Sequence, residues 1–159
     1  CNPSIPPWNF QKLWYRYGVY PMGGIGQGTM LREISDVRQI PGDPRRRWFT
    51  DETFDLIVWE YRAGGIAGFQ LCYDNGGDQR ALSWFPDGGL RHCAVDTGES
   101  RPGKPKGVPI LVCDVDKTGS PRDSGPPAAV INRFRRAIRG LDPVLARFIL
   151  AHLCLDPDA

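Results

Sequence analysis

The sequence predicts an α+β fold, in which an antiparallel meander sheet of five to six strands is followed by a C-terminal pair of helices packed on one face. Three observations predict it. Short runs rich in β-branched and aromatic residues recur between residues 54 and 114, turn residues separate these runs, and from residue 128 the apolar spacing becomes helical. The length of 159 residues suits one modest domain, and without 18 consecutive apolar residues we expect no membrane partner.

The predicted strands begin at residue 31. Residues 31–40 carry an apolar residue at every third position, which fits neither a strand nor a helix cleanly, and we assign them to a strand. Residues 55–61 and 66–73 are clearer strand candidates. Gly64 and Gly65 lie between them and predict a hairpin with a two-residue turn.

Turn residues mark the remaining strands. An Asn-Gly-Gly-Asp turn at 75–78 precedes a strand at 79–85, and a Pro-Asp-Gly-Gly turn at 86–89 precedes a strand at 90–97. Residues 108–114 supply the last strand, after a linker rich in Gly, Pro and Lys. Because strands that follow one another through short turns usually pair, we expect a meander.

The pattern becomes helical in the last fifth of the chain. From residue 128 to residue 139, apolar residues recur at helical spacing, and Gly140 provides the C-terminal stop. Asp142 and Pro143 then provide an N-cap and a first-turn proline for a second helix that continues to Leu153. The two amphipathic helices therefore have one face each to bury against the sheet.

The hairpin turns also predict which side chains share a face. With Asp74 opposite Gln79 and Phe85 opposite Leu90, one face is largely apolar, and we expect the helices to pack on it. In this register Gln70, Ser83 and His92 would stand side by side on the other face. That mixed face carries six candidate binding residues: Trp59, Tyr61, Gln70, Ser83, Phe85 and His92.

Two functions compete for the mixed face. An aromatic and polar surface suits a small binding or accessory domain without intrinsic catalysis, which engages a ligand or a protein partner, and this is the function we favour. Ser83 beside His92 would instead suit a hydrolase-like enzyme, because histidine can take the proton of a neighbouring hydroxyl. Catalysis in the middle of a regular strand lacks backbone donors for an oxyanion, since the ladder uses them.

Two arginine clusters offer a third function, a nucleic-acid interface. Arg45, Arg46 and Arg47 precede Trp48, which would place phosphate contacts next to a stacked base, and the same segment could engage the ligand or protein partner. Acidic residues at 43, 51, 52 and 55 flank this cluster and favour an internal ion-pair network instead. The second cluster comprises arginines at 133, 135, 136 and 139 on the first predicted helix, where a solvated helix face is the alternative to anion or RNA binding.

The cysteines and glycines carry no cofactor signature. Five cysteines lack both a CxxC pair and a zinc-like Cys/His spacing, so we expect no metal. The glycine-rich residues 23–28 match neither the dinucleotide-binding nor the P-loop pattern, so we expect no cofactor. Three cysteines fall in apolar runs, where a free thiol behaves as a small buried hydrophobe, and this favours a cytoplasmic location.

Residues 1–29 differ from the rest of the chain. They contain six aromatic residues, two basic residues and no acidic residue, whereas residues 30–159 are formally neutral. Three interpretations stay open: an aromatic arm that docks on the domain, a disordered interaction tail, or an upstream extension of a reading frame that starts at Met30. The predicted organisation is therefore a leader at 1–29 and a single α+β domain at 30–159.

Six segments carry a family resemblance: VRQIPG at 37–42, RRRWF at 45–49, FDLIVW at 54–59, GFQLCYD at 68–74, RALSW at 80–84 and PILV at 109–112. In these segments the chain resembles a family of small uncharacterised bacterial proteins found in proteobacteria. The resemblance implies a domain that starts near Met30, and it implies no reaction and no cofactor.

Overall fold

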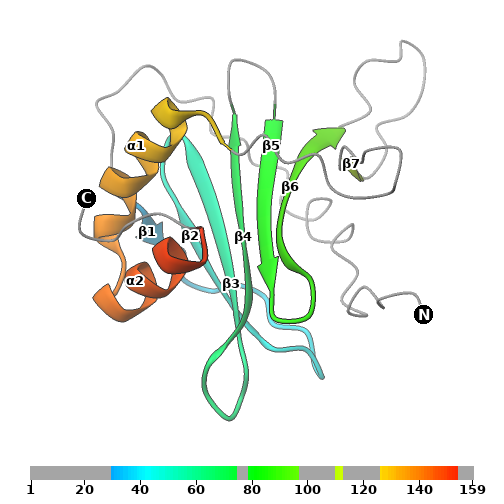
Figure 1. Cartoon of the computed structure of the whole chain (residues 1–159). Helices are drawn as coiled ribbons and strands as arrows, with labels where there is room; N and C mark the ends of the chain where they lie inside the picture. Colours follow the sequence, from blue (N-terminus) through cyan, green and yellow to red (C-terminus); the bar gives the residue numbers. More distant parts are fainter. Residues whose placement is uncertain (1–29, 75–78, 97–109, 113–125, 154–159) are drawn as a thin grey trace, which may run out of the picture.

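A seven-stranded antiparallel sheet carries two helices on one side (Figure 1). The computed structural model describes residues 30–74, 79–96, 110–112 and 126–153. The strands are β1 (Arg32–Glu33), β2 (Arg45–Thr50), β3 (Phe54–Glu60), β4 (Ile66–Asp74), β5 (Gln79–Phe85), β6 (Gly89–Asp96) and β7 (Ile110–Val112). The helices are α1 (Ala128–Ala137), the short 3-10 helix η3 (Ile138–Gly140) and α2 (Pro143–His152).

The strands pair in chain order, from β1 at one edge of the sheet to β7 at the other. Every neighbouring pair is antiparallel, so the sheet is the expected meander. The predicted α+β fold class is confirmed, including the helix pair after the sheet. The predicted leader at 1–29 lies outside the described residues, and the domain boundary at Met30 stays a prediction.

The first two strands differ from the sequence prediction. Of the strand expected at 31–40, only Arg32–Glu33 pairs with β2, whereas residues 45–50 form a strand that we did not predict. Three consecutive arginines interrupt the alternation of apolar and polar residues by which β2 could have been predicted. Arg47 and Phe49 belong to one face of the sheet, and Arg46 and Trp48 belong to the other, as their partners on β3 show.

The main core lies between the sheet and the helices, on what we call the helix-covered face. Phe54, Leu56 and Phe69 from the strands are almost fully buried there, and Phe134 of α1 packs edge-on against Phe54 with ring centroids 5.3 Å apart. Each large apolar side chain buried in this way contributes roughly 1.5 to 3 kcal/mol. The helices therefore cover the face that the apolar pattern predicted.

Both ends of α2 are held by side chains. Asp142 accepts hydrogen bonds from the backbone N–H groups of Val144 and Leu145, which caps the first turn. At the other end the His152 ring packs on Trp84 of β5, with ring centroids 4.1 Å apart. These contacts hold α2 over the strands. The helix begins at Pro143 with Asp142 as its N-cap, as predicted.

Candidate functional site

The β5–β6 hairpin has a different register from the predicted one. Phe85 pairs with Gly89 rather than with Leu90. Gly89 has φ +62°, in the left-handed region that glycine adopts without strain, and the Gly88 N–H donates to the Phe85 carbonyl. The loop therefore closes one residue earlier than predicted. A shift of one residue moves every side chain of β6 to the opposite face.

This shift separates Ser83 from His92. Ser83 lies opposite Arg91, whereas His92 lies opposite Leu82 on the helix-covered face. There Nε2 of His92 is 2.8 Å from the hydroxyl of Tyr73, within hydrogen-bonding distance. The predicted side-by-side arrangement of Ser83 and His92 is wrong, and the hydrolase hypothesis loses its structural basis.

The opposite side of the sheet, which we call the second face, retains the rest of the predicted group. Gln70 lies opposite Ser83 as predicted, and the rings of Trp59 and Phe85 lie 5.7 Å apart. Phe85 covers Gly68 so closely that a Cβ atom at Gly68 would lie 2.2 Å from the Phe85 ring. The members of this face on β3, β4 and β5 are therefore those predicted from the turns.

The second face is not an open binding surface. Trp59 is 4% exposed, Gln70 is 3% exposed and Ser83 is 8% exposed. The buried Ser83 hydroxyl has no hydrogen-bond partner among the described residues, and the Gln70 amide donates to the Cys72 sulfur at 3.2 Å. Tyr61, which we also placed in this group, is exposed in the β3–β4 hairpin.

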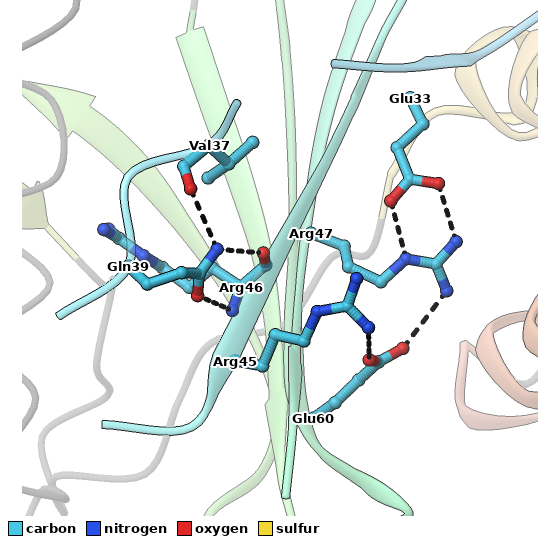
Figure 2. A network of polar contacts seen from close by, with 7 residues as sticks. All are labelled: Glu33, Val37, Gln39, Arg45, Arg46, Arg47 and Glu60. Carbon is cyan, nitrogen blue, oxygen red and sulfur yellow. Dashed lines mark hydrogen bonds and ion pairs between the residues drawn. The ribbon is translucent and has the colours of Figure 1, made fainter. Parts of the chain in front are cut away.

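The first arginine cluster forms the ion-pair network that its acidic surroundings predicted, but with other partners (Figure 2). Arg47 donates to both carboxylate oxygens of Glu33 at 2.7 Å, and it also donates to Glu60 at 3.1 Å. Arg45 lies 3.5 Å from the second Glu60 oxygen. The hydrogen bond with Arg47 lowers the pKa of Glu33, and the same hydrogen bond raises the pKa of Arg47.

Arg46 and Trp48 face the other way, toward the second face. The backbone of Arg46 makes two hydrogen bonds with the side chain of Gln39, of 2.8 and 2.9 Å, as Figure 2 shows. Trp48 donates its ring N–H to Asp55 at 3.1 Å. Residues 45 to 48 therefore serve the packing of β2, and their charges and ring are already engaged within the protein.

The second arginine cluster is different, because three of its members stay in solvent. Arg133, Arg136 and Arg139 are exposed, and we call these three residues the arginine face. Within the part of the chain that the structure describes, none of the ion pairs involves them. Arg133 and Arg136 lie on α1 and Arg139 on η3, and the buried residues of α1, Val130, Phe134 and Ala137, lie on its other side.

Formal charge is segregated between the two layers of the fold. Residues 126–153, which form the helices, carry five arginines and one aspartate, a net charge of +4. The described residues of the strands and their connections carry eight basic and ten acidic residues, a net charge of −2. The neutrality of residues 30–159 therefore conceals a basic helical layer.

A cavity of about 50 Å³ lies between α1 and strands β4 to β6. Its lining is apolar and includes Leu71, Leu82, Leu90, Val130, Phe134 and Leu153. Pockets that bind metabolites usually enclose several hundred Å³. The cavity is therefore a packing defect of the main core rather than a candidate ligand site.

The described residues contain no group of three or more metal-ligating side chains, and none of their helices has the length and apolar character of a membrane span. Cys72 is a free, buried thiol as expected, and burial raises its pKa to about 12. Cys93 differs from the expectation, because it is disulfide-bonded to a cysteine outside the described residues.

Four residues that organise these sites were not predicted from the sequence: Glu33, Gln39, Glu60 and Tyr73. Their partners come from other strands, so their roles depend on register, which the local pattern does not specify. The available signal was charge balance, since three arginines in a strand require acidic neighbours. That signal indicated a network without identifying its members.

Comparison with protein-family models, with curated proteins and with solved structures finds no match in any of the three. The fold and the chemistry of its surfaces are therefore the basis for assigning a function. They define a protein of the α+β class with a seven-stranded antiparallel meander and a basic helical layer. The resemblance to the proteobacterial family stays a prediction.

Proposed function

We propose that this chain is a binding domain without intrinsic catalysis, which contacts the phosphates of a nucleic acid through the arginine face of α1 and η3. The carrying observation is that Arg133, Arg136 and Arg139 are exposed and take part in no described ion pair. Guanidinium groups donate two parallel hydrogen bonds to phosphate and keep their charge at all physiological pH values. Arg133 and Arg136 are about 4.5 Å apart along the axis of α1, and Arg139 follows on η3.

The contrast with Arg45 and Arg47 supports this choice of surface. Both of those arginines are neutralised by Glu60, and Arg47 also by Glu33. Arginines with fixed carboxylate partners would have to break those pairs before they could bind phosphate. The arginine face has no described ion pairs to break, so a polyanion is attracted by all three of its guanidinium charges.

The composition of α1 favours double-stranded nucleic acid over a single strand or a membrane. Its one aromatic residue, Phe134, is buried in the core, so the helix offers no ring on which an unpaired base could stack. Its apolar side packs against the sheet, which leaves no apolar surface for insertion between lipids. Contacts restricted to phosphates carry no base information, and the binding should be independent of sequence.

A nucleic-acid partner agrees with the cytoplasmic location that the cysteine pattern led us to expect. The disulfide at Cys93 weighs in the other direction, because disulfides persist mainly in oxidising compartments. The redox state of Cys93 in the cell is therefore an independent test of the proposed location.

Charge reversal tests the proposed surface. Binding of a fluorescent 20-base-pair duplex is measured by anisotropy for the parent chain and for the triple variant Arg133→Glu, Arg136→Glu, Arg139→Glu. We expect the variant to bind at least tenfold more weakly. A matched control reverses three exposed arginines of the sheet layer, Arg38→Glu, Arg62→Glu and Arg91→Glu.

The control changes the net charge by the same amount. It therefore distinguishes the loss of a particular binding surface from a general effect of net charge on duplex binding. We expect its affinity to stay within about threefold of the parent. Equal losses in the two triple variants would contradict the assignment to α1. Absence of duplex binding by the parent chain at low salt would contradict the proposed function as a whole.

A further inference from the structure

The edge strand β1 is too short to cover the whole of β2. It pairs with β2 through its two residues, and the N–H of Ile34 adds one more bond, to the Trp48 carbonyl at 2.8 Å. The chain then turns at Asp36, whose φ of +63° lies in the left-handed region. In the described part of the chain, residues 45–47 therefore have no paired strand on the side that faces β1.

The side chain of Gln39 fills the position of the missing strand. Its amide oxygen accepts from the Arg46 N–H at 2.8 Å, and its amide nitrogen donates to the Arg46 carbonyl at 2.9 Å (Figure 2). An antiparallel neighbour would make the same two bonds, because a primary amide offers the donor and the acceptor of a peptide group. The amide nitrogen also donates to the Val37 carbonyl at 2.9 Å, which holds the side chain within its own segment.

Residues 34–44, which connect β1 to β2, also hold the side chain of Arg46. Its guanidinium donates to the Arg38 carbonyl, and the residue is 9% exposed although it lies beside an edge of the sheet. The Asp43 N–H then donates to the Ile40 carbonyl at 3.1 Å in a turn that leads back to β2. Unpaired edge groups are a template for pairing with another chain, and a covering loop is one way in which proteins close them.

The arginines of β2 form a second obstacle to pairing between two copies. If two copies paired antiparallel about Arg46, Arg46 would lie opposite its own copy and Arg45 opposite Arg47. Like charges directly opposite each other destabilise a sheet. This obstacle weakens with salt, because the Debye length falls from about 10 Å at 0.1 M to about 3 Å at 1 M, whereas the amide bonds of Gln39 join neutral groups.

We infer that Gln39 is an edge guard, which keeps the open half of β2 from pairing with a second copy of this chain. Without the guard, Arg46 presents one donor and one acceptor at the edge. The same two groups of a second copy satisfy both of them across a two-fold axis, so the exposed edge is complementary to itself. The inference concerns β2 alone and does not depend on the arginine face.

The variant Gln39→Ala removes the guard, and its self-association is measured by sedimentation velocity. We expect it to dimerise at least tenfold more tightly than the parent at 1 M salt, and less tightly at 0.1 M, where the arginines repel one another. Hydrogen exchange followed by NMR should show the Arg46 amide exchanging at least tenfold faster in the monomeric variant than in the parent, and protected again in the dimer.

The matched control is Ser35→Ala, which changes another exposed side chain of the same connection. It should match the parent in both measurements. A Gln39→Ala variant that stays monomeric at both salt concentrations would overturn the inference. A dimer in which the Arg46 amide remains unprotected would also overturn it, because the contact would then lie elsewhere.

If circular dichroism shows that Gln39→Ala is unfolded, Gln39→Asn replaces it in both measurements. Asparagine keeps the amide but is one methylene shorter, so it cannot hold both Arg46 groups from the same backbone position. The same dimerisation and the same change in amide exchange are expected, and their absence contradicts the inference. Unfolding of both variants would contradict it too, because an edge guard is not required for the fold.

Discussion

Glu33 and Arg47 form a bidentate ion pair that ties the short strand β1 to β2, with both nitrogen–oxygen distances at 2.7 Å. Only two residues of β1 pair with β2, so the ladder itself holds this edge weakly. The side-chain pair adds two charge-assisted hydrogen bonds to the edge, and Arg47 continues the connection to Glu60 on β3.

Removal of this pair should have a small, pH-dependent effect. Because the pKa of Glu33 is lowered in the folded state, its contribution is present above the ordinary value of 4.5 and is lost as the pH falls through the folded value. Both partners are partly exposed, and we expect Glu33→Gln to reduce the free energy of unfolding by about 0.5 to 1 kcal/mol at pH 7. Urea unfolding should show no difference at pH 2.

The exposed Glu52, for which the structure gives no ion pair with a described residue, serves as the control for this experiment. Glu52→Gln should leave the free energy of unfolding within about 0.3 kcal/mol of the parent at both pH values. A destabilisation by Glu33→Gln that persists unchanged at pH 2 would show that packing, rather than charge, holds this edge.

Gly140 should tolerate no side chain. A Cβ atom there would lie 2.3 Å from the carbonyl oxygen of Leu31, whose N–H donates to the Ala137 carbonyl at 2.9 Å. Gly140→Ala must therefore push β1 away from the helices, at a cost of about 1 to 3 kcal/mol. Thermal unfolding should show no such loss for Gly88→Ala, because the nearest atom to a Cβ at Gly88 is 3.7 Å away on the Arg91 side chain.

The apolar cavity beside α1 should accept one more methylene group. Val130 lines it, so Val130→Ile extends into empty space and should raise the free energy of unfolding by about 0.5 to 1 kcal/mol. Val58→Ile makes the same chemical change in the same core, at a fully buried position away from the cavity lining. Overpacking there should be destabilising. A loss of stability in both variants would show that the cavity wall cannot adapt.

The disulfide at Cys93 is predicted to involve Cys113. Ala94 pairs with Val112 on β7, and Cys93 and Cys113 are the residues next to this pair in the sequence. Digestion without reduction should therefore release the two peptides as one linked species, and reduction should cost about 3 kcal/mol of stability for a loop of this length. Alkylation of Cys93 in the unreduced protein would contradict the cross-link.

The elements that local pattern predicted well are those in which sequence period and burial agree. The change of period at residue 128, the Asp142 cap and the Asn-Gly-Gly-Asp turn at 75–78 led directly to the helices and to the correct β4–β5 register. β2 was missed because Arg45, Arg46 and Arg47 mask its alternation, and burial there depends on partners from β1 and β3.

The candidate site was harder to predict, because one glycine decides it. Gly89 can pair with Phe85 in a left-handed conformation or belong to the loop, and the sequence Pro-Asp-Gly-Gly permits both. The choice determines whether His92 accompanies Ser83 or Tyr73. The solvent exposure of the arginines could not be predicted either. The arginines of α1 and those of β2 look alike in sequence, and only the tertiary structure shows which of them have carboxylate partners.

Salt dependence tests the proposed function most directly. Three arginines that neutralise three phosphates release three counterions, so the logarithm of the duplex association constant should fall with the logarithm of salt concentration with a slope of about −3. The variant in which Arg133, Arg136 and Arg139 are reversed should lose this slope. A parent slope near zero, or the same slope in parent and variant, would contradict phosphate binding by the arginine face of α1 and η3.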